Sequence, residues 1–140
     1  MGIRQLSVFV ENKRGSLSKI TDLLAGANID LRSMCVADTS DYGIVRIIAN
    51  DPVRAHEVLS EAGQIANIRT VTAFAVPDAP GGLAKVLALL DDKGINMEYM
   101  YALVTTEKDK AYAVMRTDDY EGAEEILSAN GVELLDEAHI

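Results

Sequence analysis

Two glycine-containing turns carry the residue types best suited to holding a small charged molecule. The first reads Asn12-Lys13-Arg14-Gly15-Ser16-Leu17, and the second reads Asp78-Ala79-Pro80-Gly81-Gly82-Leu83. Each turn is followed by apolar residues at helical spacing, so a helix is expected to begin directly after it. Glycine lets the backbone approach a ligand, and the free N–H groups of a helix start attract a carboxylate. The sequence therefore predicts a carboxylate-binding turn at each of these two places.

An acid or an amide also follows each of these helices. In the first copy the turn residue Asn12 is paired with Asp30, which follows the helix. In the second copy Asp78 is paired with Asn96, so the two residue types are exchanged between the sites. An aspartate accepts hydrogen bonds from an α-ammonium group, and an asparagine can donate to a carboxylate. This pairing predicts a pocket for a zwitterion, with both members of each pair facing one ligand. The alternative is that all four are ordinary turn or cap residues.

The two turns belong to an internal repeat. Residues 17–34 match residues 83–100 at an offset of 66, and residues 51–63 match residues 119–131 at an offset of 68. The second copy therefore has two additional residues, which we expect in a hairpin around residues 106–109. Repetition on both sides of that insertion predicts two related domains, at residues 1–70 and 71–140.

Each copy shows the element order strand, helix, strand, strand, helix, strand. In the first copy the expected strands are residues 6–10, 29–37, 43–48 and 65–69, with helices at 17–27 and 52–62. In the second copy they are residues 71–76, 95–105, 110–116 and 132–135, with helices at 83–93 and 120–129. This order is the ferredoxin-like βαββαβ arrangement, an α+β fold with both helices on one face of an antiparallel sheet.

Local signals place the ends of these elements. Ser16 is the expected N-cap of the first helix, and Asp51 with Pro52 is the expected start of the second. Glycines at the expected helix ends suit a left-handed C-terminal cap, and they are Gly63, Gly94 and Gly131. The residues Asp38-Thr39-Ser40-Asp41 form a turn cluster.

Composition excludes several classes of function. The chain has 140 residues and a formal net charge of −9, and Lys13-Arg14 is its only basic pair, which disfavours binding to nucleic acid or to anionic membranes. Cys35 is the only cysteine, and neither His56 nor His139 has metal-ligand spacing, so we expect no metal site and no cofactor. The start of the sequence lacks the features of a signal peptide, which predicts a cytoplasmic protein.

The turn Asp78–Leu83 with Gly94-Ile95-Asn96, and the turn Glu11–Leu17 with Asn28-Ile29-Asp30, resemble the signature of ACT domains. These are amino-acid-sensing modules of regulated biosynthetic enzymes. The resemblance implies a non-enzymatic regulator that binds a free amino acid at the interface between two ACT units. We also expect a homodimer that covers the open faces of the sheets, and a metabolic enzyme as partner. The positions that match the ligand-binding motif are Asn12, Gly15, Ser16, Leu17 and Asp30, then Asp78, Gly81, Gly82, Leu83 and Asn96. The first copy departs from the motif by having Arg14 where the family often has proline.

Two other functions remain open from the sequence. One is a docking subunit of a biosynthetic enzyme that has no ligand of its own. The other is a small acylphosphatase-like hydrolase, for which Arg14 and Asn12 have suitable chemistry in the first turn, although the second copy lacks the arginine.

Overall fold

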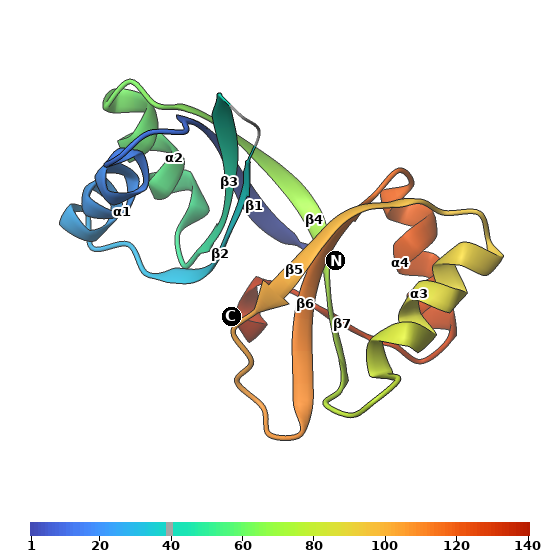
Figure 1. Cartoon of the computed structure of the whole chain (residues 1–140). Coiled ribbons are helices and arrows are strands. Elements are labelled where there is room, and N and C mark those ends of the chain that lie inside the picture. The colour runs from blue at the N-terminus through green and yellow to red at the C-terminus, as the bar shows by residue number, and fades with distance from the viewer. Residues whose placement is uncertain (39–40) are drawn as a thin grey trace. The chain divides into compact units, whose positions relative to one another are not determined.

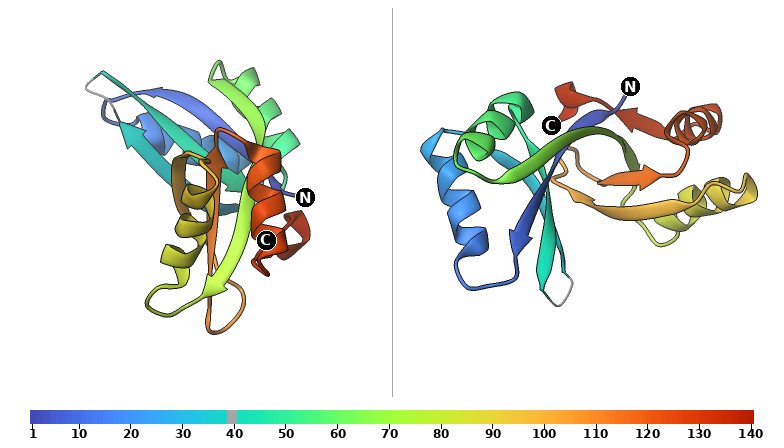
Figure 2. Two further views of the ribbon diagram at one scale, coloured as in Figure 1. Left: turned by 90° about the vertical axis from the view of Figure 1, so that its right-hand side faces the viewer. Right: turned by 90° about the horizontal axis from the view of Figure 1, so that it is seen from above.

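The computed structural model describes residues 1–38 and 41–140, and these divide into two compact units (Figure 1, Figure 2). The first unit is Arg4–Arg69, and the second combines Thr70–Ile140 with Met1–Ile3. The expected turn at residues 38–41 includes residues 39 and 40, which lie outside the described residues.

The first unit contains three strands, of which the first begins one residue before the unit does, together with two helices and the beginning of a fourth strand. In chain order these are β1 (Ile3–Glu11), α1 (Ser16–Gly26), β2 (Leu31–Asp38), β3 (Tyr42–Ala49), α2 (Pro52–Glu61) and the first part of β4 (Ile65–Pro77). The strands lie in the order β2–β3–β1–β4. Both β1 and β2 are antiparallel to β3, so they run parallel to each other. Figure 1 shows α1 and α2 together on one face of this sheet.

The second unit repeats this arrangement. It contains the rest of β4, then α3 (Gly82–Asp92), β5 (Met97–Leu103), β6 (Lys110–Thr117), α4 (Tyr120–Ala129), β7 (Glu133–Leu135) and a final 3-10 turn (Glu137–His139). Its strand order is β5–β6–β4–β7, again with two helices on one face of the sheet (Figure 1). The predicted α+β class and the duplicated βαββαβ order are therefore confirmed.

Each unit has its own apolar core between the helices and the sheet. Burial of these side chains supplies most of the folding free energy, at roughly 25 cal/mol per Å² of apolar surface. The fully buried members in the first unit include Leu6, Val8, Ile20, Leu24, Val45, Ile47 and Leu59. In the second unit they include Phe74, Met115, Ala123 and Leu127. The alternation predicted for the first strand is present, because Leu6, Val8 and Val10 are buried while Phe9 is exposed.

Most of the predicted helix ends are confirmed. Asp51 caps α2 by accepting a hydrogen bond from the Arg54 N–H, and Pro52 is the first helical residue. Gly94 and Gly131 have φ values of 69° and 74°, as expected for residues that follow a helix. The second strands of both copies begin later than predicted, at Leu31 and Met97. The reason is that the N–H groups of Ile29 and Ile95 bond to the carbonyls of Leu24 and Leu90 and complete the helix ends instead.

The predicted strands at residues 65–69 and 71–76 are a single strand. β4 runs from Ile65 to Pro77 without a break, so the last strand of the first unit continues as the first strand of the second. No glycine or proline interrupts the segment before Pro77, and Thr70 is itself a good strand former. Met1–Ile3 lie with the second unit because Gly2 bridges to Asp136 and the Tyr120 hydroxyl donates to the Met1 carbonyl.

Candidate functional site

The turn between β1 and α1 ends in a left-handed glycine. Gly15 is the N-cap of α1 with φ 88°, a conformation that favours glycine, and its carbonyl accepts the Lys19 N–H at 3.0 Å. The prediction that Ser16 caps this helix is wrong, because Gly15 occupies that position and Ser16 is the first helical residue. No side chain of the described residues caps α1, which leaves N–H groups of its first turn available to solvent or a ligand.

The corresponding turn of the second unit has the same backbone. Gly81 is the N-cap of α3 with φ 86°, and its carbonyl accepts the Lys85 N–H at 3.2 Å. Gly82 has a different role, since a Cβ atom at this residue would lie 2.5 Å from the carbonyl oxygen of Pro77. The close approach of helix and strand therefore requires glycine at position 82, whereas the first unit accommodates Ser16 there.

The acid and amide residues of the two turns are exposed and bond through their backbones. The Asn12 N–H donates to the Asp41 carbonyl at 3.2 Å, and the Asp78 N–H donates to the Asp109 carbonyl at 2.9 Å. Each bond joins a strand–helix turn to the hairpin connection beside it. Leu17 and Leu83, which begin the two helices, are each 37% exposed.

Asp30 and Asn96 do not face these turns within their own units. The turn of the first unit follows Glu11, which pairs with Tyr42, whereas Asp30 precedes Leu31, which pairs with Ala49. The two ends of β3 are seven residues apart, or roughly 20 Å at the rise of a β-strand. The second unit has the same separation, because Pro77 pairs with Lys110 and Met97 pairs with Thr117. The predicted pairs Asn12–Asp30 and Asp78–Asn96 are therefore wrong as contacts within one unit.

Asp30 and Asn96 instead close the opposite ends of their sheets. The Asp30 N–H donates to the Asn50 Oδ1 atom at 3.0 Å, while the Asn50 N–H donates to the Asp30 carbonyl at 3.1 Å. In the second unit Asn96 and Asp118 form the same two bonds, each at 3.0 Å. Both units thus close this end of the sheet with the same two hydrogen bonds. The acceptor is an amide oxygen of Asn50 in the first unit and a carboxylate oxygen of Asp118 in the second, so either residue type can fill this role.

A pocket of about 590 Å³ opens at the turn end of the first unit. Its lining residues come from both strand ends, the turn, the start of α1 and the connection from α2 to β4: Phe9, Val10, Glu11, Lys13, Arg14, Gly15, Ser16, Lys19, Tyr42, Gly63, Gln64 and Ile65. The rings of Phe9 and Tyr42 contact each other with centroids 6.2 Å apart, and both side chains are more than two-fifths exposed. The pocket therefore combines an apolar wall with the free start of a helix.

The charged residues of this pocket are mainly cationic. Among the described residues, its lining contains the cations Lys13, Arg14 and Lys19, and Glu11 as the single carboxylate. Lys13 Nζ lies 2.8 Å from Glu11 Oε2, and the hydrogen bond between them lowers the pKa of Glu11 and raises the pKa of Lys13. Arg14 and Lys19 form no ion pair with a carboxylate of the described residues. The pocket is therefore suited to an anionic group, although the whole chain carries a net charge of −9.

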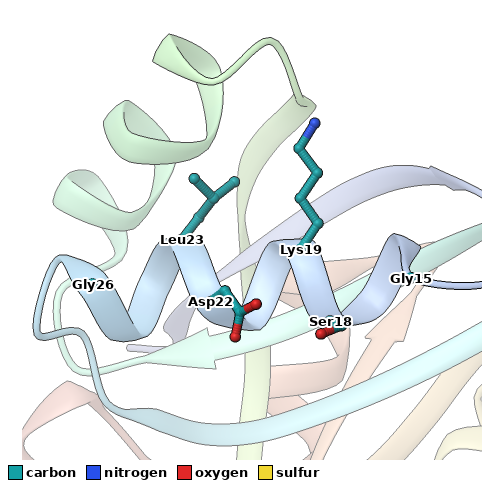
Figure 3. Close-up of a pocket in the computed structure, with 6 residues that line it drawn as sticks. All are labelled: Gly15, Ser18, Lys19, Asp22, Leu23 and Gly26. Carbon is teal, nitrogen blue, oxygen red and sulfur yellow. The ribbon is translucent and has the colours of Figure 1, made fainter.

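A second hollow, of about 530 Å³, follows the outer surface of α1 (Figure 3). It begins at Gly15 and is lined by residues of one helix face as far as Gly26, and the side chains of Lys19 and Leu23 extend on one side of it. Every lining residue belongs to a single helix and its cap, so no second element contributes groups that could enclose a ligand. We therefore take the pocket at the turn end as the candidate site.

The described residues contain no group of three or more His, Cys, Asp or Glu side chains placed to hold a metal ion. His56 is partly buried, and its Nε2 atom lies 3.0 Å from the Ala66 carbonyl oxygen. The Nδ1 atom of His139 lies 2.8 Å from Asp136 Oδ1. Both histidines therefore stabilise local structure.

No helix in the described part of the chain is long and apolar enough to cross a bilayer.

A family model for the ACT domain pair matches residues 1–140, so this chain belongs to the ACT domain family and contains a pair of such domains. No curated protein matches the sequence significantly. The solved structure of a protein from Bacteroides thetaiotaomicron is 38% identical, with a TM-score of 0.90. That match covers 96% of this chain and 92% of the other.

Two structures of aspartate kinase regulatory subunits have the same fold at lower identity. The ligand-free subunit from Thermus thermophilus has a TM-score of 0.63 and 16% identity, with coverage of 91% of this chain and 92% of the other. The subunit from Thermus flavus has a TM-score of 0.60 and 18% identity, with coverage of 90% of each chain. At this identity the likeness is evidence for the fold alone.

The motif identified the turns but missed several residues of the pocket. Phe9, Tyr42 and Ile65 line it together, although they are far apart in the sequence. The repeat offered one signal for these residues, because the aromatic or aliphatic side chains at the three positions are replaced in the second copy by Ala75, Lys110 and Glu133. Cationic Lys19 is one turn beyond the motif and carried no signal of its own.

Proposed function

We propose that this chain is a non-enzymatic regulatory protein that binds a free amino acid through the turn end of an ACT unit. The observation that carries the proposal is the turn at Gly15, where a left-handed glycine begins a helix that no side chain of the described residues caps. This turn lies beside a pocket in which Arg14 and Lys19 form no ion pair with a described carboxylate. Free helix N–H groups and a guanidinium are both good partners for an α-carboxylate. Turn residues Asn12, Ser16 and Leu17 belong to the proposed binding region.

The proposal includes binding at an interface between ACT units, as the family signature implies. Asp30 and Asn96 lie about 20 Å from the turns of their own units, so they can reach a ligand there only when another ACT unit contributes them. A site of that kind would couple ligand binding to assembly, because a ligand stabilises the assembly state that binds it better. We propose a cytoplasmic homodimer, which a light-scattering mass of twice 15.1 kDa would support.

We further propose that the output of binding is the regulation of a metabolic enzyme. The regulatory subunits of aspartate kinase share this fold, and they are examples of such chains that belong to a metabolic enzyme. The alternative, a docking subunit with no ligand, differs from the proposal in a single property that can be measured directly. It predicts that no free amino acid changes the stability of the chain.

The test is a thermal-shift panel of the twenty amino acids on the full chain. A ligand that binds only the folded state at 100 times its Kd adds about 2.7 kcal/mol of stability, and 1 kcal/mol is worth about 2–4 °C in a chain of this size. We expect one amino acid or a chemically related few to raise the melting temperature by several degrees. Its D-enantiomer should have no effect.

A variant pair links any shift to the turns. The double substitution Gly15→Ala and Gly81→Ala disfavours the left-handed caps and should abolish the shift, because alanine is strained at φ near 87°. Gly26→Ala is the matched control, since Gly26 is a helical residue without positive φ and has open space around it. A flat response across the panel would favour the docking alternative and contradict the proposal.

A further inference from the structure

The repeat allows the turn ends of the two units to be compared position by position. At offsets of 66 and 68, Phe9 corresponds to Ala75, and Tyr42 corresponds to Lys110. The strand pairing agrees with this correspondence, since Glu11 pairs with Tyr42 in one unit and Pro77 pairs with Lys110 in the other. Ile65, on the other side of the pocket, has Glu133 as its counterpart.

The second unit has an ion-pair cluster at these positions. Lys110 Nζ lies 2.8 Å from Glu107 Oε2 and 2.7 Å from Glu133 Oε2, and the Tyr112 hydroxyl donates to Glu107 Oε1 at 2.7 Å. Because β4 lies between β6 and β7, the pair Lys110–Glu133 spans the end of β4. The two positions that flank the pocket in the first unit, Tyr42 and Ile65, are thus occupied in the second unit by Lys110 and Glu133, which form an ion pair with each other.

Two of the three cations of the pocket, Lys13 and Arg14, are present only in the first unit. Lys13 and Arg14 correspond to Ala79 and Pro80, so only Lys85, the counterpart of Lys19, is conserved between the copies in charge. The turn of the second unit instead contains the carboxylate of Asp78. An anionic ligand therefore meets a net positive lining in the first unit and an acidic turn in the second.

We propose that the first unit alone binds the ligand and that this ligand is an amino acid with an acidic side chain, aspartate or glutamate. The inference rests on the proposed function and adds the stoichiometry and the ligand class. Arg14 offers a planar fork for one carboxylate, and Lys19 with the start of α1 offers partners for the other. Glu11 is the carboxylate among the described lining residues, and in the complex its ion pair with Lys13 would be exchanged for one with the α-ammonium. The Phe9–Tyr42 wall suits the methylene groups between the two carboxylates of the ligand.

The experiment is a calorimetric titration of the full chain with L-aspartate, L-glutamate, L-asparagine and L-glutamine. Each acid and its amide have nearly the same size, so the comparison isolates the side-chain charge. We expect an acid to bind with one site per chain, at least tenfold more tightly than its amide, because a hydrogen bond to a charged group is worth about 1.5–3 kcal/mol. Succinate and inorganic phosphate are titrated as anions without an α-ammonium, and both should bind at least tenfold more weakly.

Matched variants in the two units locate the site. Arg14→Gln and Lys19→Gln should each weaken binding of the acid at least tenfold, and Lys85→Gln at the equivalent helical position of the second unit should leave it unchanged. All three side chains are exposed, so their removal should preserve the melting temperature of the free protein, which is measured alongside.

The outcomes separate this inference from the proposed function. Equal binding of acids and amides, two sites per chain, or a loss of binding in Lys85→Gln but not in Arg14→Gln would overturn the inference while leaving amino-acid binding in place. Succinate or phosphate binding as tightly as the acid would overturn the assignment to an amino acid. If none of the twenty amino acids binds, both the inference and the proposed function fail.

Discussion

At the scale of single residues, asparagine and aspartate have one role at the turns and another at the opposite end of each sheet. Asn50 and Asp118 accept the N–H of the residue before the second strand of their units. Asp30 and Asn96 contribute backbone N–H and carbonyl groups to the same closure, and the Asp30 carboxylate pairs with Arg32 at 3.2 Å rather than with the closure. The two members of each pair should therefore differ in how much their side chains stabilise the fold.

The first prediction concerns this difference. Asp118→Ala should lower the free energy of unfolding by about 1 kcal/mol, because the Asn96 N–H loses its acceptor. Asn96→Ala should change it by less than about 0.5 kcal/mol, because the side chain of this exposed residue is outside the closure. Urea unfolding of the two variants beside the parent measures both values. Equal losses in the two variants would show that the Asn96 side chain has a structural role of its own.

The second prediction concerns Gly82. Alanine is a better helix former than glycine by up to about 1 kcal/mol, but a Cβ atom here would lie 2.5 Å from the Pro77 carbonyl oxygen. Because a backbone atom cannot move aside cheaply, the contact should dominate, and Gly82→Ala should lower the free energy of unfolding by about 1–3 kcal/mol. Ser16→Ala at the equivalent position is the control, with an expected change within about 0.5 kcal/mol. A stabilised Gly82→Ala variant would refute the close approach of helix and strand.

At the scale of elements, the β5–β6 hairpin of the second unit is held by Lys110. The Lys110 hydrogen bond is the largest cause that lowers the pKa of Glu107 from its ordinary value of 4.5, followed by the bond from Tyr112. Bonds to Glu107 and Glu133 raise the pKa of Lys110 above 10.5. A lowered carboxyl pKa contributes stability that is present above pH 4.5 and is lost as pH falls through the folded value. The raised lysine pKa extends the stabilised range beyond pH 10.5.

The third prediction follows from these directions. Lys110→Gln should be less stable than the parent at about pH 7, and the difference should shrink as pH falls toward about 3 and Glu107 becomes protonated. Lys108→Gln, on the same hairpin and without an ion pair to a described residue, is the control and should show no such pH-dependent difference. Unfolding free energies at several pH values measure the effect. A difference that does not change with pH would mean that Lys110 acts by packing rather than by charge.

Element limits show where local sequence signals suffice. The cap at Asp51 was predicted correctly because its type, spacing and following proline all act within one helical turn. The cap at Ser16 was not, because a left-handed Gly15 supplies the turn and leaves the serine inside the helix. The continuous strand β4 was missed since a strand that passes from one unit to the next has no breaker to reveal the boundary.

At the scale of the whole molecule, net charge and local charge have opposite signs. The chain carries −9 in total, while the pocket of the first unit has more cations than carboxylates. Repulsion from the overall field disfavours anionic polymers and surfaces, whereas a small anion within the pocket is governed by its nearest partners. The duplicated fold thus supplies two turns with the same backbone and different electrostatics.

The sequence by itself determined the duplicated element order, the presence of a helix after each of the two turns and membership of the ACT family, because spacing and turn chemistry act over short distances along the chain. Only the tertiary structure decided which of the predicted residues meet. Since β1 and β2 are parallel, Asn12 and Asp30 lie at opposite ends of one sheet, whereas Tyr42 and Ile65 meet the turn at Gly15. Strand register sets such contacts, and register depends on pairing between segments that the sequence alone does not bring together.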